Sequence, residues 1–202
     1  MQLIIFGAGG FLGSSLIRKV KGNFSDVLCI SRNFSLISPQ ERNSLANQNV
    51  NFLRCDARDI DKYSHLIQPN HSAVFMAGST SLVEAEKNCF NDLSSHSNSL
   101  LSSLQHLQSA HKIIFVSSGG TVYGECSQDH KRETDKTHPI SIYGKRNMIM
   151  EQIVQAICSN LSIPFSILRL SNPFGSDQFS MQRKGLICAL VESCFSGKPV
   201  YL

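Results

Sequence analysis

Apolar residues along the chain occur either in short unbroken runs or in longer segments where they recur every three or four positions. The short runs are rich in β-branched residues, as buried strands are, and the longer segments have the period of amphipathic helices. The runs cover residues 3–6, 27–30, 50–53, 73–76, 113–116 and 165–170, and the helical segments cover residues 11–20, 60–67, 82–89, 93–107, 143–158 and 181–195. Strands and helices in alternation require parallel pairing, because each crossover is long enough to return the chain to the same edge of the sheet. The pattern therefore predicts an α/β fold, a doubly wound parallel sheet.

The sequence changes character after Leu170. Residues 172–175, Asn-Pro-Phe-Gly, mark a turn before the last helical segment. Residues 197–202 are typical of a turn that leads into a strand. We therefore expect one domain over residues 1–170 and the beginning of a second, smaller one over residues 171–202.

Composition narrows the class of protein. The chain has 202 residues, of which 42% are apolar and 17% charged, enough for an ordinary globular core. Its formal net charge of +4 arises from 19 basic and 15 acidic residues without a basic run, which argues against nucleic acid but permits anionic small molecules. No segment approaches the ~20 apolar residues of a membrane-spanning helix, and the N-terminal run meets glycine too early for a signal peptide. We expect a cytoplasmic protein that binds neither nucleic acid nor a membrane.

Cysteine and histidine spacing predicts no metal site. The seven cysteines include no CxxC pair and their number is odd, so neither a zinc site nor a disulfide framework is indicated. Buried thiols in a reducing cytosol are the favoured interpretation. The histidines likewise show no metal-ligand spacing.

A glycine-rich turn, Gly-Ala-Gly-Gly-Phe-Leu-Gly, directly follows the first strand and opens the first helix. Gly7 permits the tight turn, Gly10 lets the backbone approach a pyrophosphate, and Gly13 lets the helix pack closely on the sheet. The helix N-terminus offers free N–H donors to phosphate. This position in a strand, turn and helix favours dinucleotide binding over a merely structural turn. The contacts predicted here are Gly7, Gly10, Phe11, Leu12 and Gly13.

Ser31, Arg32 and Asn33 stand at the end of the second strand, where an acidic residue would hold the ribose 2′-OH of NAD. A hydroxyl and a guanidinium can instead accept the 2′-phosphate of NADP, because arginine presents a planar fork of donors. Alternatively, Arg32 stacks over the adenine or points to solvent. We favour NADP over NAD, with Ser31 and Arg32 as contacts.

The next two strands end in further candidate contacts. Asp56 and Ala57 follow the third strand, and Asp56 can accept a hydrogen bond from the adenine amino group or serve as an ordinary turn former. Ala77 and Gly78 follow the fourth strand and suit a close approach of the cofactor.

Three later segments complete a resemblance to a known family. Ser-Ser-Gly-Gly-Thr-Val-Tyr-Gly at 117–124 ends the fifth strand, Tyr-Gly-Lys at 143–145 opens the next helix, and Leu-Arg-Leu-Ser-Asn-Pro-Phe-Gly stands at 168–175. With the glycine turn, and in this order, they resemble the extended short-chain dehydrogenase/reductase superfamily, and within it the nucleotide-sugar epimerases and dehydratases related to UDP-glucose 4-epimerase. The resemblance implies a Rossmann domain that binds NAD or NADP, followed by part of a domain for a UDP-, GDP- or dTDP-sugar. Asn172 is then a candidate substrate contact, or only a turn residue.

The resemblance assigns proton transfer to Tyr143. In the family a tyrosine removes a proton from a sugar hydroxyl while hydride passes to the nicotinamide. Tyrosine titrates near pH ~10 and needs a nearby cation to act as a base, which the family supplies as a lysine four residues later that also holds the nicotinamide ribose. This chain has Asn147 there, which can bind a ribose hydroxyl but carries no charge. Lys145 does not replace the lysine, because a residue two positions away points to the opposite side of a helix.

A second departure concerns the hydroxyl that positions the substrate oxygen. The family's Ser or Thr position falls on Gly119, so Ser118 or Thr121 has to supply the hydroxyl, and we favour Thr121. On the helix that supports the cofactor in the family, His96 occupies the place of an asparagine, and we favour a packing role for it over a functional one.

Three functional hypotheses follow. The first is an NAD(P)-dependent nucleotide-sugar epimerase, dehydratase or reductase with Tyr143 as the proton-transfer residue. The second is a catalytically impaired dinucleotide-binding module, a pseudoenzyme or partner subunit, suggested by Asn147 and the short C-terminal region. A redox-sensing NADP binder, resting only on Ser31 and Arg32, is weaker. Since the family often pairs through a four-helix bundle, the resemblance also implies a homodimer through residues 93–107 and 143–158.

Overall fold

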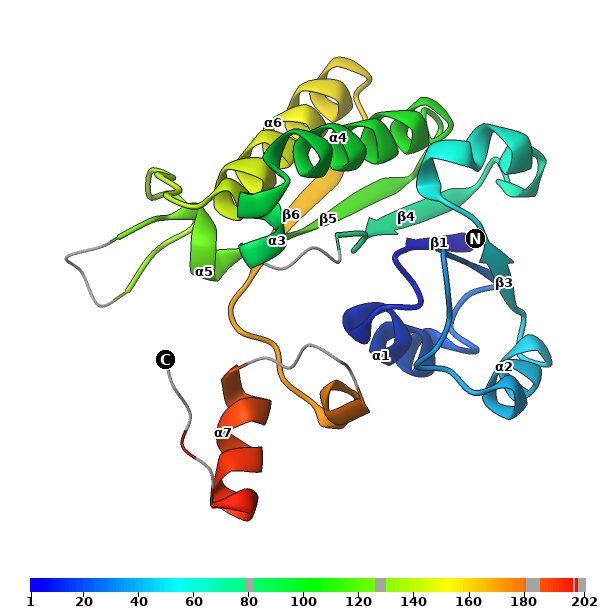
Figure 1. Cartoon of the computed structure of the whole chain (residues 1–202). Helices are drawn as coiled ribbons and strands as arrows, with labels where there is room; N and C mark the ends of the chain where they lie inside the picture. The colour runs from blue at the N-terminus through cyan, green and yellow to red at the C-terminus, as the bar shows by residue number, and fades with distance from the viewer. Residues whose placement is uncertain (79–81, 126–129, 181–185, 198, 200–202) are drawn as a thin grey trace.

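The six predicted strands form a single parallel sheet. The computed structural model describes residues 1–78, 82–125, 130–180, 186–197 and 199. In this part of the chain the strand order is β3-β2-β1-β4-β5-β6, so the chain winds outward from β1 in both directions (Figure 1). The strands are β1 (Gln2–Phe6), β2 (Asp26–Ser31), β3 (Val50–Arg54), β4 (His71–Phe75), β5 (Lys112–Ser118) and β6 (Phe165–Leu170). The prediction of a doubly wound parallel sheet is confirmed.

Helices cover both faces of the sheet. Figure 1 shows α4 (Cys89–Gln105) and α6 (Ile142–Asn160) on one face, and α1 (Phe11–Val20) and α2 (Pro39–Ala46) on the other. The 3-10 helix η1 (Ala57–Leu66) packs against α4. The sheet is therefore buried on both sides, as a parallel sheet with crossover helices requires.

Alternate residues of each strand supply the two halves of the core. Ile4 and Phe6 of β1 pack with α4 and α6, whereas Leu3 and Ile5 pack with α1 and α2. The rings of Phe6 and Phe75 stack between the paired strands β1 and β4, with centroids 4.5 Å apart. This period of two, with both sets apolar, explains why the strands appear in the sequence as unbroken apolar runs.

Several predicted helices differ from the observed ones. Segment 60–67 lies in a 3-10 helix rather than an α-helix, and its end shows hydrogen bonds that reach back three residues, such as the one from Ile67 N–H to the Ser64 carbonyl. Segment 82–89 is the short helix α3 (Leu82–Lys87), and α4 begins at Cys89, four residues before the predicted start. The helix α2 and the one-turn helix α5 (Gly119–Val122) were not predicted.

The chain beyond β6 contains two further helices, η2 (Ser176–Ser180) and α7 (Leu186–Ser196). Part of the predicted helix 181–195 coincides with α7, while residues 181–185 and the predicted strand at 200–202 lie outside the described residues. Asp177 accepts hydrogen bonds from Arg18 and Ser14 of α1, which fastens this segment to the first helix. The division into domains at Leu170 stays a prediction.

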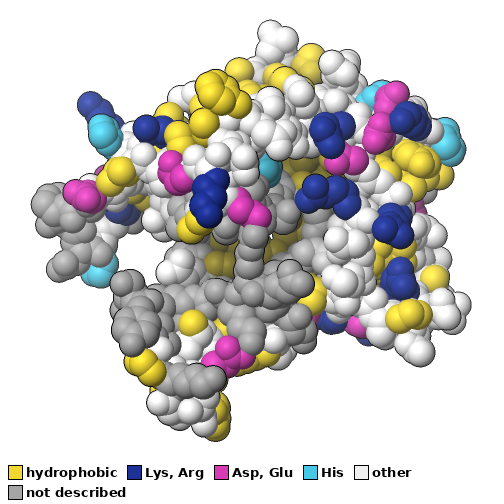
Figure 2. Space-filling view, viewed as in Figure 1, with side chains coloured by type: hydrophobic (Ala, Val, Ile, Leu, Met, Phe, Trp, Pro, Cys, Tyr) yellow, Lys and Arg dark blue, Asp and Glu magenta, His cyan; other side chains and the backbone are white. Residues whose placement is uncertain are grey.

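Charges are mixed on the surface. On the face drawn in Figure 2, Lys and Arg side chains stand among Asp and Glu side chains. In the part of the chain that the structure describes, no helix is long and apolar enough to cross a membrane.

Candidate functional site

A cavity of about 380 Å³ lies at the carboxyl edge of the sheet. Figure 2 shows this face hollowed between the layer of α4 and α6 and the C-terminal segment that contains α7. The cavity lies beside the point where the chain, having built β1 to β3 in one direction, crosses over to β4. In open α/β sheets such a crevice is the usual ligand site. Its lining includes nine residues predicted from the sequence, namely Leu12, Ala57, Ala77, Gly78, Ser118, Thr121, Tyr143, Asn147 and Asn172.

The glycine-rich turn has the geometry that the sequence suggests. Gly7 has a φ of +82°, and a Cβ there would lie 2.7 Å from the amide nitrogen of Ala77. A Cβ on Gly13 would overlap the carbonyl oxygen of Gly7, so α1 packs directly on the turn. Gly10 caps α1 without a side-chain hydrogen bond, which leaves the N-terminal N–H groups of the helix open to an anion.

Ser31, Arg32 and Asp56, which follow or end β2 and β3, lie outside the lining of the cavity. Arg54 Nε donates to the carbonyl oxygen of Arg32 at 3.0 Å, so two guanidinium-bearing residues meet next to Ser31. The carboxylate of Asp56 accepts from the backbone N–H of Arg58 and pairs with its guanidinium, each at 3.0 Å. The hydrogen bonds from Arg58 hold the pKa of Asp56 below its usual range. Asp56 thus forms the turn that opens η1, and its contact with adenine stays a prediction.

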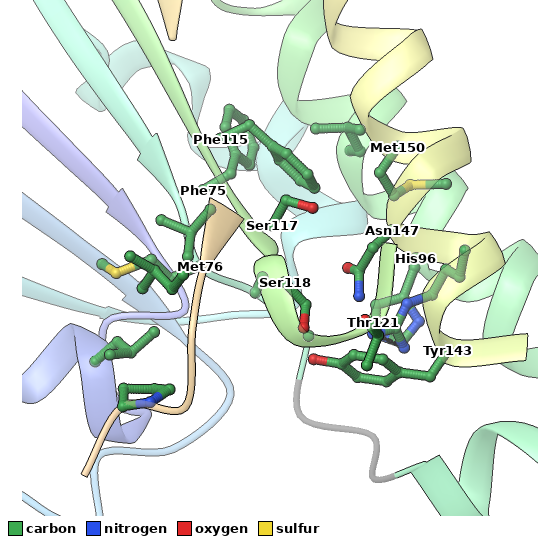
Figure 3. Close-up of a pocket in the computed structure, with 18 of the residues that line it drawn as sticks. Phe75, Met76, His96, Phe115, Ser117, Ser118, Thr121, Tyr143, Asn147 and Met150 are labelled. Carbon is green, nitrogen blue, oxygen red and sulfur yellow. Dashed lines mark hydrogen bonds between the residues drawn. The ribbon is translucent and has the colours of Figure 1, made fainter. Parts of the chain in front are cut away.

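Tyr143 lies in the first turn of α6, next to the short helix α5. Ser141 caps α6 by accepting from the Gly144 N–H at 3.0 Å. A Cβ on Gly144 would lie 2.6 Å from the carbonyl oxygen of Thr121, so α5 and α6 touch at this point. In Figure 3 the phenol oxygen of Tyr143 and the hydroxyl of Ser118 point to the same part of the cavity, with Thr121 beside the ring.

The hydroxyl groups near Tyr143 differ in what they contact. Ser117 donates to Glu151 at 2.5 Å inside the protein, so this serine is already engaged. Thr121 Oγ1 is buried and has no hydrogen-bond partner among the described residues. A Cβ on Gly119 would lie 2.8 Å from the carbonyl oxygen of Arg169 on β6. This backbone therefore excludes a side chain at 119, and the assignment of the positioning hydroxyl to Ser118 or Thr121 stays a prediction.

Asn147 also carries a buried polar atom without a partner among the described residues. It follows Tyr143 by one helical turn on the same face of α6 and is only 7% exposed. Its Nδ2 makes no hydrogen bond within the described part of the chain. An orphaned buried donor costs about 1–3 kcal/mol, so Asn147 Nδ2 is a strong candidate for a ligand contact.

A buried ion pair that was not predicted from the sequence lies next to Tyr143. Arg146 Nη1 donates to both carboxylate oxygens of Asp92 on α4, at 3.0 and 3.1 Å. His96, also on the cavity wall, lies with Nδ1 2.7 Å from the carbonyl oxygen of Asp92 and with Nε2 3.4 Å from Arg146 Nη1. Burial first, and the guanidinium of Arg146 second, lower the pKa of His96 below its usual value. The sequence did contain a signal for the contact with Tyr143, because Arg146 follows it by three positions. Residues three apart on a helix share one face, as residues four apart do.

Comparison with models of protein families identifies the family over almost the whole chain. The model of the "NAD dependent epimerase/dehydratase family" matches residues 3–202. The chain belongs to this family.

Solved structures of similar proteins share the fold of this chain. The chain is 24% identical over 194 residues to a "Putative UDP-glucose 4-epimerase" of Methanocaldococcus jannaschii, covering 95% of this chain and 62% of that protein. It superposes on the Thermotoga maritima UDP-glucose 4-epimerase, solved with UDP-glucose, with a TM-score of 0.85, 22% identity and coverage of 100% and 65%. For the Thermus thermophilus UDP-glucose 4-epimerase in complex with NAD, the TM-score is 0.82, the identity 20% and the coverage 99% and 64%. The chain thus spans less than two thirds of the length of each of these proteins.

The residues of this site fit the dinucleotide that the family description names. The N-terminus of α1 at Gly10 can receive a diphosphate, because no side chain covers the backbone N–H groups there. A Cβ on Gly10 would lie 3.3 Å from the Gly7 carbonyl oxygen, in the space that glycine leaves open. Thr121 Oγ1 and Asn147 Nδ2 are polar atoms buried at the other end of the site without a partner within the described residues. Both would gain hydrogen bonds from a ligand that carries hydroxyl or amide groups.

Proposed function

We propose that this chain binds NAD or NADP across the carboxyl edge of its sheet and belongs to an oxidoreductase of the nucleotide-sugar epimerase/dehydratase type. The observation that carries the proposal is the cavity in which Tyr143 lies beside two buried polar atoms, Thr121 Oγ1 and Asn147 Nδ2, that have no hydrogen-bond partner among the described residues. Family membership and the glycine turn at the start of α1 support the same function.

Each part of the site has a distinct role in this proposal. The N–H groups at Gly10 and the first turn of α1 bind the diphosphate, and Asn147 donates to a hydroxyl of the nicotinamide ribose. The nicotinamide supplies the hydride acceptor for oxidation of a sugar carbon. Tyr143 accepts the proton of the sugar hydroxyl, and Thr121 or Ser118 holds the same oxygen in place.

The substrate proposed is a nucleoside diphosphate sugar. The relatives that this chain resembles include UDP-glucose 4-epimerases, one of them solved with UDP-glucose. Asn172 lies on the cavity wall after β6 and is the candidate contact for the substrate diphosphate. The pairing of two copies through α4 and α6 belongs to the same proposal.

A second candidate function is a dinucleotide-binding module without turnover. It is favoured by Asn147, which brings no charge to Tyr143, and by Gly119, where the backbone leaves no room for a hydroxyl side chain. The two candidates share cofactor binding and differ in hydride transfer. They are separated by adding UDP-glucose to the protein loaded with oxidised cofactor and following the absorbance of reduced nicotinamide, which appears only if the site oxidises the sugar.

Cofactor binding is tested first, by calorimetric titration of the full chain with NAD and with NADP. We expect a single site, which Gly10→Ala weakens by at least about tenfold, because the added methyl group stands where the diphosphate approaches α1. Asn23→Ala, at an exposed position just beyond the opposite end of α1, is the matched control and keeps the affinity. If neither dinucleotide binds at millimolar concentration, the proposed function is wrong.

A further inference from the structure

Arg146 places a buried positive charge against Tyr143. Its guanidinium carbon lies 4.5 Å from the centroid of the Tyr143 ring, and the residue is only 2% exposed. The two residues are three positions apart on α6 and therefore share one face of the helix. Arg146 also lines the cavity that contains Tyr143 and Asn147.

The position of this charge is fixed from α4. Arg146 Nη1 binds both oxygens of the Asp92 carboxylate, whose side chain is 1% exposed. His96 Nδ1 faces a carbonyl oxygen and therefore carries the hydrogen, which leaves Nε2 to accept from Arg146 at 3.4 Å. Arginine keeps its charge at every pH at which a protein stays folded. A permanent, immobilised cation thus stands on the face of the tyrosine ring.

We propose that Arg146 supplies to Tyr143 the positive charge that Asn147, a neutral residue at the position where the resemblance expects a lysine, cannot supply. This inference rests on the proposed function, in which Tyr143 accepts a proton. The negative charge of a phenolate spreads over the ring, so a cation above the ring face stabilises the ionised form more than the neutral one. On this assignment Arg146 is a positioning residue that acts through Tyr143, and Asn147 keeps only the task of binding the ribose.

Other charged groups near Tyr143 do not replace this contact. From α4, the Asp92 carboxylate offsets part of the Arg146 charge, but the guanidinium is the group that lies over the Tyr143 ring, and a neutral His96 adds no charge. From α3, Glu86 accepts from the Ile142 N–H at 2.6 Å and is exposed, so water screens it. On α6 itself, Lys145 is exposed and points away from the cavity face. Ser118 and Thr121, on the side of β5 and α5, are uncharged.

The test measures ionisation of Tyr143 directly. Ionised tyrosine has a distinct ultraviolet absorbance, and the difference between a pH titration of the full chain and one of its Tyr143→Phe variant isolates this residue. We expect Arg146→Gln to move the midpoint of Tyr143 ionisation upward by about one pH unit or more, a tenfold smaller ionised fraction at a given pH. Arg146→Lys restores most of the shift. Lys145→Gln removes an exposed cation from the adjacent position as the matched control, and it leaves the midpoint in place.

Two results overturn the inference. One is an unchanged midpoint in Arg146→Gln, and the other is an equal shift in Lys145→Gln, which would indicate an effect of net charge alone. Because Arg146→Gln leaves the Asp92 carboxylate buried without its partner, the double variant Asp92→Asn/Arg146→Gln is titrated as well, and its result is read in the same way if the single variant does not fold. Calorimetry with NAD on the same proteins keeps the two proposals apart: a wild-type chain that fails to bind NAD contradicts the proposed function, while the titration still decides the role of Arg146.

Discussion

Thr121 Oγ1 and Asn147 Nδ2 are buried in the wall of one cavity, and neither has a hydrogen-bond partner among the residues that the structure describes. Buried polar atoms in folded proteins are nearly always paired. Both exceptions lie in one cavity, and a bound ligand with hydroxyl or amide groups would complete their hydrogen bonds, as the proposed function requires. The two polar atoms would then strengthen ligand binding but lower the stability of the protein without ligand, because an unpaired buried polar atom costs free energy.

Replacement of Asn147 tests this opposition. We expect Asn147→Leu to weaken NAD binding by about three- to tenfold, the value of one hydrogen bond of roughly 1 kcal/mol. Without cofactor, the variant unfolds at the same temperature as the wild type or a higher one, because the leucine removes an unpaired buried donor. Calorimetry and thermal unfolding measure the two effects.

The matched control is Gln152→Leu, an exposed position on the same helix, which changes neither quantity beyond the scatter of surface substitutions. A marked loss of stability in Asn147→Leu without cofactor would mean that Nδ2 is satisfied within the chain.

The choice between Thr121 and Ser118 is open to a direct comparison. Thr121→Val keeps the shape of the side chain and removes the hydroxyl, and we expect it to slow sugar oxidation about a hundredfold with unchanged NAD affinity, since one positioned hydrogen bond in a site contributes about this much. Ser118→Ala slows the reaction by less than about tenfold. The rate of appearance of reduced nicotinamide after mixing with UDP-glucose measures both variants, and the reverse order would assign the role to Ser118.

The sheet could be predicted almost completely from the sequence, because both faces of each strand are buried. Residues of β1 such as Ile4 and Ile5 point to opposite layers of the core, and both have to be apolar. The helix α2 was missed for the converse reason, since Leu45 is its only buried residue and no apolar period exists. Its signal lay in the cap instead: Ser38 accepts from the Glu41 N–H at 3.1 Å, and Pro39 occupies the first turn.

The part of the site that a single motif builds could be predicted from the sequence. The part that forms where distant segments of the chain meet could not. Gly7 and Gly13 belong to one turn, whose geometry follows from local sequence. Asp92 and Arg146 are 54 positions apart in sequence and lie on different helices, and no local pattern shows that their side chains meet. His96 lies on the cavity wall and contacts Asp92 of its own helix as well as Arg146 of α6, and no pattern within α4 shows the second contact. The packing role favoured for it stays a prediction.

The predicted preference for NADP rests on Arg32, whereas the family description names NAD. Comparison of the affinities for NADP and NAD tests this prediction. If Arg32 binds a 2′-phosphate, Arg32→Ala weakens NADP binding by at least about tenfold, the value of a charge-assisted hydrogen bond, and changes NAD binding by less than about twofold. Lys21→Ala, an exposed cation beyond the far end of α1, is the control for net charge. A wild-type chain that binds NAD more tightly than NADP, with both affinities insensitive to Arg32→Ala, would show that this guanidinium does not select the cofactor.

The lowered pKa of His96 makes stability depend on pH in one direction. Burial and the Arg146 guanidinium favour the neutral ring in the folded protein, whereas in the unfolded chain the ring titrates near its ordinary value of 6.5. Above that value both states hold a neutral ring, and His96 contributes no pH dependence. Below it the unfolded chain takes up the proton more readily, so the free energy of unfolding falls as the pH drops from 6.5 toward the lower pKa of the folded state.

Urea unfolding at a series of pH values across this window measures the slope. We expect His96→Gln to flatten it, even though the variant is less stable at every pH because the hydrogen bond to the Asp92 carbonyl oxygen is changed. His65→Gln, which removes an exposed ring from η1, accounts for the general effect of losing one titratable group. If both variants flatten the slope equally, or if stability rises as the pH falls through this window, then His96 is not held neutral beside Arg146, and the arrangement of donors around the guanidinium has to be different.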